Sequence, residues 1–435
     1  MNKQDGRNLP DVILSVDGSP TEIDIAYAYL KSRGVFDFEV YPTGMFPAVG
    51  KGSLNEATSG YRAVWVRDNM HVAYAHHVCG NSKTAVCCVA ATLKFYLAHP
   101  EWFTDVIDNP ESARNPMNRP HIRFDGETGE AIGEKWPHDQ NDALGAFMWL
   151  LCRLVRDDAM AFNDEIDRLL SLMTRYFDAI CYWADEDSGH WEEQRKISAS
   201  SIGAVCAGLQ EYVALMQSSE SRNVVHGQDD LAARILDKGL DALNRILPFE
   251  CNQSEPRKHR RYDAALLFLA EPYNIVSDDK AEQIIADVSE HLQGEYGIRR
   301  YLLDSYWGPD YRTVPPEKRT IDLSEDIIRR DDYAVEGQEA QWCIFDSIIS
   351  IYWGKRYQRT GAKKSLENQA LYLLRTLSQL VESSDCRLLM PEAYFFESGK
   401  YVPNDHLPLQ WAMANLWRAM NLALTTKPPL KRKTL

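Results

Sequence analysis

Four short segments of the 435-residue chain combine tryptophan or other aromatic residues with charged side chains. They read "YRAVWVRDNM" (61–70), "EKWPHDQND" (134–142), "GHWEEQRK" (189–196) and "LMPEAYFF" (389–396). An indole ring presents a flat apolar face with one polar edge, and a positioned carboxyl group can give or take a proton. This combination suits a cleft that stacks flat sugar-like rings and binds their hydroxyl groups.

The third segment carries two adjacent glutamates, Glu192 and Glu193, directly after Trp191. The chain immediately downstream, residues 198–209, is small and apolar. Two interpretations are open here. The segment is either a solvated loop with two spare charges, or it holds one carboxyl group against an aromatic ring, where burial favours the protonated form.

Each candidate also has a simpler explanation when it is taken alone. Arg67 and Asp68 could form a surface ion pair, Asp142 could cap the N-terminus of a helix, and Trp136 could serve packing only. The argument for a site therefore depends on the four segments occurring together.

The elements that must position these segments are helical, because helical periodicity extends through nearly the whole chain. Some helical stretches are rich in small residues and apolar almost all round, which is typical of buried helices. These stretches are residues 141–155, 198–216, 339–353 and 408–424.

Other stretches are amphipathic, with apolar residues on one face only, and such helices face water on the other side. They are residues 163–183 (Ile166, Leu169, Leu170, Met173 and Phe177), 229–247 (Leu231, Ile235, Leu236, Leu240 and Leu243) and 279–292. Alternation of the two types predicts an all-α fold, an α/α barrel with an inner and an outer ring of about six helix pairs. The long non-helical stretches between them, such as 109–140, 295–319 and 388–406, are expected to carry function.

The composition limits the function classes. Hydrophobic residues make up 45% of the chain and the formal net charge is −15, which argues against nucleic acid and anionic membrane surfaces as partners. We find no stretch of membrane-spanning length and no secretory apolar segment, so we expect a cytoplasmic protein. The nine cysteines lack metal-ligand spacing, and Cys88, Cys152, Cys206 and Cys343 are expected to be buried free thiols. We expect one barrel domain over residues 21–426, an N-terminal extension (1–20) and a basic tail (427–435).

The four segments, in this order and spacing, resemble those of glucoamylase-type glycoside hydrolases and of the related N-terminal domain of phosphorylase kinase α and β subunits. "YRAVWVRDN" is similar to the Trp-x-Arg-Asp element, "KWPHDQNDA" to the Trp–Gln-Asn-Asp segment and its kinase-subunit version, and "GHWEEQ" followed by "SASSIG" to the Trp-Glu element. "RRYLLDSYWGPDY" and "EGQEAQWCIF" look closer to the kinase-subunit branch, and "MPEAYFF" resembles the Pro-Glu element of both. The resemblance covers about residues 25 to 425.

This resemblance implies an (α/α)6 barrel that hydrolyses α-glucosidic bonds with inversion, without metal or organic cofactor. Glu192 would be the general acid and Glu392 the general base, and their positions on different loops agree with the wide carboxyl separation that an inverting enzyme needs. The remaining matched residues would bind substrate, an oligosaccharide or glucoside. They are Trp65, Arg67, Asp68, Trp136, His138, Gln140, Asp142, Trp191, Glu193, Trp342 and, by its spacing to Trp342, Arg330.

Three alternatives stay open at this level. The chain could bind sugar without turning it over, as the kinase-subunit likeness allows. It could be another enzyme on the same barrel, such as a sugar epimerase or a disaccharide phosphorylase, the latter needing inorganic phosphate in place of the base. It could also be a helical scaffold in which the clustering of polar and aromatic residues has no catalytic meaning.

Overall fold

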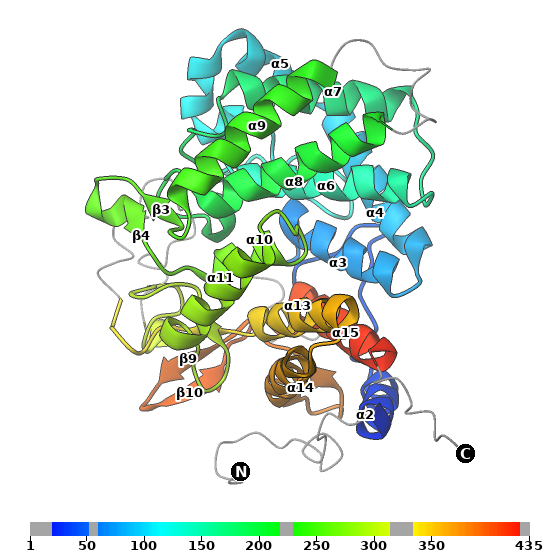
Figure 1. Cartoon of the computed structure of the whole chain (residues 1–435), viewed down its shortest axis with the longest axis vertical. Coiled ribbons are helices and arrows are strands. Elements are labelled where there is room, and N and C mark those ends of the chain that lie inside the picture. The colour runs from blue at the N-terminus through cyan, green and yellow to red at the C-terminus, as the bar shows by residue number, and fades with distance from the viewer. Residues whose placement is uncertain (1–19, 52–59, 218–228, 314–333, 427–435) are drawn as a thin grey trace.

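The computed structural model describes residues 20–51, 60–217, 229–313 and 334–426. Residues 1–19 of the expected N-terminal extension and the basic tail 427–435 lie outside this part. The described chain is predominantly helical, with only short strands between the helices (Figure 1). The predicted fold class, an (α/α)6 barrel, is confirmed by the arrangement of these helices.

Six helices form the inner ring. Each contacts the next, and the last contacts the first, so that the ring closes. They are α3 (Val66–Val78), α6 (Asn141–Arg156), α8 (Ala199–Met216), the short α10 (Leu267–Ala270), α13 (Phe345–Thr360) and α15 (Gln410–Thr425).

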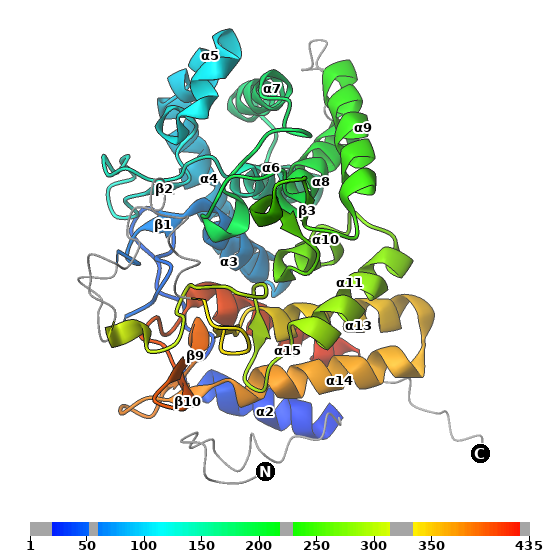
Figure 2. The ribbon, with the colours of Figure 1, turned by 90° about the vertical axis from the view of Figure 1, so that its left-hand side faces the viewer.

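The outer ring covers the inner one, and its helices alternate with the inner helices along the chain. Figure 2 shows α2 and α14 at one end of the view and α5, α7 and α9 at the other. The outer helices are α2 (Pro20–Ser32), α4 (Ser82–Ala98) with α5 (Glu101–Asp108), α7 (Asp164–Ala179), α9 (Asp229–Ile246), α11 (Asp278–His291) and α14 (Lys363–Ser378).

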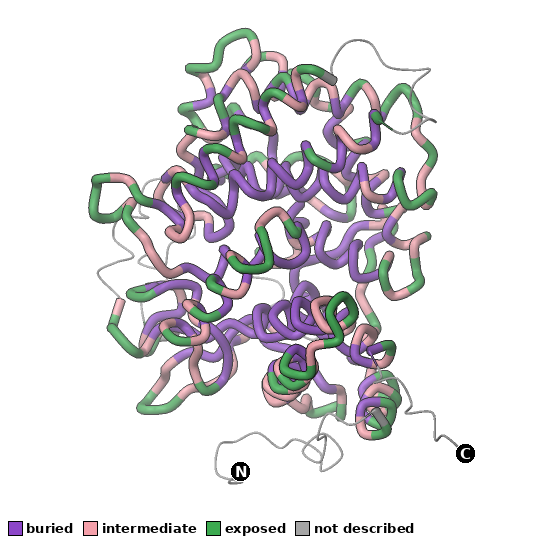
Figure 3. Tube along the Cα trace, viewed as in Figure 1, coloured by how far each residue is buried: buried purple, intermediate pink, exposed green. Residues whose placement is uncertain are grey.

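Burial follows the two rings, as the sequence pattern predicts. Helices α6 and α8 are buried along almost their whole length, whereas α7 buries one face, including Ile166, Leu170 and Phe177 (Figure 3). The predicted boundary at residue 339 is wrong, because residues 341–342 form a strand and α13 begins only at Phe345. Strand pairing competes with helix in this short apolar stretch, where periodicity cannot separate the two.

Small residues let the inner helices pack backbone to backbone. A Cβ atom on Gly145 would lie 2.5 Å from the backbone carbon of Ala204, and one on Gly208 would lie 2.9 Å from the carbonyl oxygen of Gly145. Real side chains do not fit at such distances, so α6 and α8 approach closely only because both carry glycine at the contact. This explains why the buried helices are rich in small residues.

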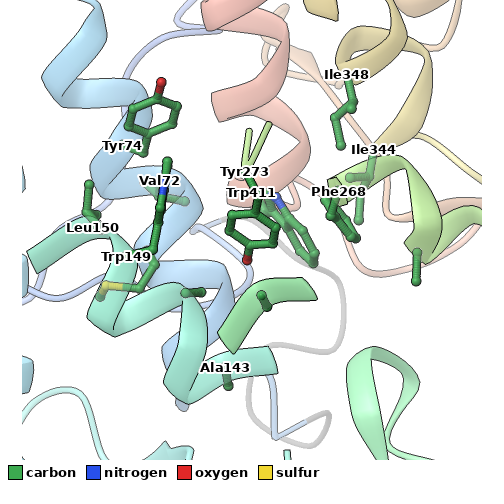
Figure 4. Packing of buried hydrophobic residues seen from close by; sticks show 14 of the residues in the cluster. Val72, Tyr74, Ala143, Trp149, Leu150, Phe268, Tyr273, Ile344, Ile348 and Trp411 are labelled. Atoms are coloured by element: carbon green, nitrogen blue, oxygen red, sulfur yellow. The ribbon is translucent and has the colours of Figure 1, made fainter. Parts of the chain in front are cut away.

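Aromatic rings fill the centre of the inner ring. Phe268 of α10 stacks on Trp411 of α15 with ring centroids 5.4 Å apart, and Tyr273 and Trp149 meet edge to face beside them (Figure 4). The four predicted buried thiols, including Cys88 and Cys206, are buried. Among the described helices, none combines the length and the apolar character needed to cross a membrane.

Short strands and 3-10 turns form the loops at the ends of the helices. The largest sheet is antiparallel, with strand order β10-β9-β6-β5. The strands are β1 (Val64–Trp65), β2 (Arg123–Phe124), β3 (Cys251–Asn252), β4 (His259–Arg260), β5 (Ile298–Arg299), β6 (Gln341–Trp342), β7 (Val381–Glu382), β8 (Leu388–Leu389), β9 (Ala393–Glu397) and β10 (Lys400–Pro403). The 3-10 helices are η1 (Pro110–Arg114), η2 (Pro116–Asn118), η3 (Gly189–Trp191), η4 (Pro256–Lys258), η5 (Ala264–Leu266) and η6 (Tyr311–Thr313).

Candidate active site

Glu392 lies just before β9 and is surrounded by hydrogen-bond donors. Its Oε2 accepts from the Asn404 amide at 2.8 Å, from the His406 ring nitrogen Nδ1 at 2.8 Å and from the Tyr306 hydroxyl at 3.4 Å. Its Oε1 accepts from the Tyr61 hydroxyl at 3.0 Å. The residue is 3% exposed. An ionised carboxylate only accepts hydrogen bonds, so four donors match its needs.

A tight hairpin brings two of these donors back to Glu392. Strands β9 and β10 pair with Tyr394 opposite Pro403, and Ser398 and Gly399 both have positive φ at the turn (51° and 86°). Two such residues form the hairpin turn that matches the natural twist of paired strands. Beyond the strands, the Glu392 amide donates to the His406 carbonyl oxygen at 2.9 Å. The local hairpin therefore sets the acceptor and two of its donors.

Glu192 has different surroundings. It directly follows η3, in the loop that leads to α8, and its side chain is 13% exposed. Its Oε1 accepts from the Trp65 indole nitrogen at 2.8 Å and lies 3.6 Å from Nη2 of Arg67. Its backbone is left-handed (φ 54°, ψ 49°), which costs a non-glycine residue about 1–2 kcal/mol. Such strain persists only where the surrounding structure imposes it.

Two aromatic side chains connect the two glutamates. Trp65 donates to Glu192, Tyr61 donates to Glu392, and the rings of Trp65 and Tyr61 lie 5.4 Å apart. The carboxyl group of Asp68 interacts electrostatically with both glutamates. Its pKa is raised to about 7, mainly by burial, while Arg67 opposes the rise and the charges of Glu192 and Glu392 contribute to it. Three carboxyl groups from three separate segments thus gather in one place.

The cation Arg67 connects the first and second segments. Its Nη1 donates to Oε1 of Gln140 at 3.0 Å and to Oδ2 of Asp142 at 2.9 Å. Asp142 is fully buried, and burial alone would raise its pKa. The nearby His190 and Arg67 outweigh that effect and hold the pKa of Asp142 below its ordinary value. Asp142 therefore acts as a fixed anion that orients Arg67 in the first turns of α3 and α6.

Trp136 contacts Trp65, and His138 follows two residues later in the second segment. The Trp65 and Trp136 rings meet edge to face at 5.9 Å, and the Arg123 guanidinium lies 4.1 Å from the Trp136 ring centre. His138 stacks on His121 at 3.8 Å. Burial, with His121 and Arg123 nearby, lowers the pKa of His138 to about 2, so its ring is neutral.

A second aromatic group surrounds Arg300. Its guanidinium lies 5.2 Å from the Trp191 ring centre, 5.0 Å from that of Trp342 and 4.8 Å from that of Tyr306. Both oxygens of Asp304 accept from it at 2.6 Å. Trp342 stands opposite Ala393 in the β6–β9 pair, and so next to Glu392 in the sheet.

Glu193 is buried and pointed away from Glu192's partners. Its Oε1 accepts from Lys196 at 2.9 Å and from Arg260 at 2.5 Å, and its Oε2 accepts from Tyr301 at 2.5 Å. Burial alone would raise its pKa, but Arg260 and Lys196 hold the pKa well below its ordinary value. These contacts do not show whether Glu193 also binds substrate, and that role stays a prediction.

The structure brings together the candidates of all four segments, while Arg330 lies outside the described residues. The sequence reasoning missed several side chains that lie among them. Most come from stretches already marked by their aromatic content or loop length: Tyr61, Arg300, Tyr301, Tyr306, Asn404 and His406. In the described part of the chain, no set of three or more acidic, histidine or cysteine side chains is arranged to hold a metal ion.

Comparison with solved structures supports the fold. The chain is similar to a wild-type glycosidase (TM-score 0.64, 15% identity, covering 93% of this chain and 96% of that one) and to the glucoamylase of Saccharomycopsis fibuligera (TM-score 0.61, 13% identity, 98% of both chains). A bacterial glucoamylase complexed with acarbose is also similar (TM-score 0.54, 16% identity, 88% of this chain and 53% of that one).

Among curated proteins, the chain is similar to a probable phosphorylase b kinase regulatory subunit alpha of Drosophila melanogaster, with 23% identity over 383 residues. That match covers 81% of this chain but only 28% of the relative. An uncharacterized lipoprotein, YgeQ, of Escherichia coli is 32% identical over 149 residues, which is 30% of this chain and 56% of that protein. The chain thus spans part of the length of both relatives.

The family model for glycosyl hydrolases family 15 matches residues 31–405, which include both glutamates and every other described candidate. The chain belongs to glycosyl hydrolases family 15.

Proposed function

We propose that this chain is an inverting glycoside hydrolase that removes terminal α-linked glucose from an oligosaccharide or glucoside. The single observation that carries the proposal is the pairing of Glu192 and Glu392. Their carboxyl groups come from different loops, differ in surroundings and are connected through Trp65 and Tyr61.

In this mechanism Glu192 donates its proton to the glycosidic oxygen as the bond from that oxygen to C1 breaks. A water molecule attacks C1 from the opposite face, and Glu392 accepts one proton of that water. The leaving sugar departs with a hydroxyl group and the glucose product has the β configuration. Glu392 suits the base role because Oε1 accepts only from Tyr61 among the described donors, which leaves it a lone pair for water.

Substrate binding would use the groups around the two glutamates. Arg67, fixed by Gln140 and Asp142, offers guanidinium donors to sugar hydroxyls, and Asp68 offers acceptors. Trp65 and Trp136 would pack against the apolar face of the terminal ring. Arg300 among its aromatic rings lies near Trp191 and would contact the leaving sugar.

A second candidate is a sugar-binding regulatory domain without turnover. It is favoured by one specific observation, the similarity over 81% of this chain to a protein that bears the name of a kinase regulatory subunit. The two candidates differ at Glu192: a binding domain needs no proton donor, whereas a hydrolase loses its chemistry without one.

Proton NMR of wild type and Glu192→Gln with maltose, isomaltose, trehalose and short dextrins tests the proposal. We expect β-glucose to appear first with one of these substrates and to disappear in the variant, with the thermal unfolding temperature nearly unchanged. Binding of these sugars without release of glucose by the wild type would support the regulatory domain instead. A requirement for inorganic phosphate would indicate a phosphorylase.

A further inference from the structure

The two residues that flank Glu192 are both anchored to one buried aspartate. The Trp191 indole nitrogen donates to Oδ1 of Asp263 at 2.9 Å. Oδ2 of Asp263 accepts from Arg260 at 2.9 Å, and the same Arg260 nitrogen donates to Glu193 at 2.5 Å. One carboxylate therefore holds residue 191 directly and residue 193 through a guanidinium.

Asp263 is itself rigidly placed. It is fully buried, and its Oδ1 also accepts from the Ala265 amide at 2.8 Å as the cap of η5. Arg260, at the end of β4, packs its guanidinium 3.5 Å from the ring centre of Tyr301, whose hydroxyl donates to Glu193. Strand β4, η5 and the Tyr301 loop together form a frame behind residues 191 and 193.

The residues held by this frame lie on either side of the strained backbone of Glu192. Between its two anchored neighbours, this residue alone has the left-handed conformation, and its carboxyl group points to Trp65 on the first segment. Turning the backbone of residue 192 back to an ordinary conformation would require Trp191 or Glu193 to leave its buried partner. The strain is thus imposed from both sides.

We propose that Asp263 is a positioning residue that, through Trp191 and the Arg260–Glu193 ion pair, fixes the carboxyl group of Glu192 for proton donation. Asp263 does not touch substrate in this scheme. The inference deepens the proposed function and rests on it, because it concerns the same proton donor.

Leaving-group dependence separates this role from a general loss of structure. In α-glucosyl fluoride the C1–F bond breaks with fluoride taking the electron pair, so little help from an acid is needed, while water still adds to C1 and Glu392 takes its proton. For Asp263→Asn we expect kcat to fall about 10- to 100-fold on an oligosaccharide but less than about 3-fold on glucosyl fluoride. Glu192→Gln should show the same pattern with a larger loss.

The matched control is Glu271→Gln, which changes another buried carboxylate between two cations, Lys355 and Arg418. It lies at the end of α10 and contacts none of the residues around Glu192, so it should affect both substrates equally. If Asp263→Asn does not fold, Trp191→Phe keeps an aromatic ring at this position, removes the indole donor to Asp263 and should show the same substrate-dependent loss. Equal losses on both substrates for these variants would overturn the inference.

A crystal structure of Asp263→Asn gives a readout that does not depend on turnover. We expect residue 192 to leave the left-handed region or its carboxyl group to leave Trp65. A wild type that turns over neither substrate overturns the hydrolase function. A variant structure with Glu192 unchanged overturns the positioning role, whether or not the wild type is active.

Discussion

The two glutamates at the centre of the site occupy opposite kinds of surroundings. Glu392 has a 4% exposed side chain and accepts from four donors, all of them side chains. Glu192 has a 13% exposed side chain and one short hydrogen bond, from Trp65, while its position is set by the anchors on its neighbours. Glu392 is therefore held by hydrogen bonds to its carboxylate oxygens, whereas Glu192 is held mainly through the side chains of its two neighbours in the chain.

This difference fits the two roles in an inverting reaction. A base must present an ionised oxygen to the attacking water, and a set of donors around the carboxylate keeps that oxygen oriented. An acid must lose and regain a proton, and Glu192, which is held through its neighbours, accepts a single short hydrogen bond, from Trp65, among the described residues. Variants that affect one region and spare the other can therefore test the assignment.

The largest effect is expected from the glutamates themselves. Glu192→Gln and Glu392→Gln should each lower kcat on an oligosaccharide by about 10³-fold, since general acid or base catalysis contributes 10²- to 10⁴-fold. Glucosyl fluoride should separate them, because Glu392→Gln loses activity on it and Glu192→Gln largely keeps it. Steady-state rates on both substrates check this, and the reverse pattern would mean that the two roles are exchanged.

The next effect concerns the donors to Glu392. The His406 ring donates to Glu392 and also stacks on Tyr61, with centroids 3.7 Å apart. His406→Ala removes both contacts and should lower kcat about 10- to 100-fold on oligosaccharide and fluoride alike, because it disturbs the base.

The control for this variant is His77→Ala, in the last turn of α3, since the His77 ring also contacts a carboxylate, that of Asp157, at 3.0 Å. Comparable losses in the two variants, measured as kcat with each substrate, would show that the fall does not come from the surroundings of Glu392. A loss confined to the oligosaccharide would place His406 with the acid.

The contrast also explains which parts of the molecule the sequence could predict. Helical periodicity and all-round apolar stretches predict the two rings, because burial leaves a direct trace in residue pattern. Trp65, Glu192 and Glu392 stand out because an aromatic next to a charge in a loop is an unusual local pattern.

The residues that hold these side chains in place show no such local pattern in the sequence. Asn404 and His406 reach Glu392 only through the β9–β10 hairpin, and Asp263 reaches Trp191 across 72 residues of chain. Neither contact follows from local spacing, since each depends on a tertiary approach. The Ser398-Gly399 turn is the one local signal that could have predicted the hairpin.

A smaller effect is expected for Tyr61→Phe. The Tyr61 hydroxyl donates to Glu392 and also contacts the hydroxyl of Tyr306. Burial and the charge of Glu392 hold the pKa of Tyr61 well above its ordinary value, so it remains a donor at any working pH. The variant keeps the ring against Trp65 and loses the hydroxyl that contacts Glu392 and Tyr306, so we expect kcat to fall about 10-fold with KM little changed.

Tyr41→Phe serves as its control, since the Tyr41 hydroxyl donates to a backbone carbonyl, that of Arg62, instead of a carboxylate. Steady-state kinetics on the oligosaccharide distinguishes the two variants. A Tyr61→Phe enzyme with unchanged kcat would mean that the other three donors, Asn404, His406 and Tyr306, are enough to hold the base.

The smallest expected effect lies between the two regions, at Asp68. Its pKa is raised to about 7 by burial, against Arg67 and with the charges of Glu192 and Glu392. The native state therefore binds a proton that the unfolded chain releases near pH 4, and the stability from this proton is lost as the pH rises through 7. Asp68→Asn removes that loss. From pH 5 to pH 8, the difference in free energy of unfolding between the variant and the wild type should therefore shift by about 1 kcal/mol in favour of the variant, after allowance for the partial exposure of Asp68.

Denaturant titrations at the two pH values measure this difference, and Asp279→Asn, an exposed carboxyl in the first turn of α11, reports the effect of removing a surface charge. Repeating the measurement in Glu192→Gln and Glu392→Gln tells which glutamate acts on Asp68. Both neutral variants should weaken the pH dependence, because each removes a negative charge that opposes ionisation of Asp68. If only one of them does so, Asp68 belongs to that glutamate's region, and the two carboxyl groups are electrostatically separate.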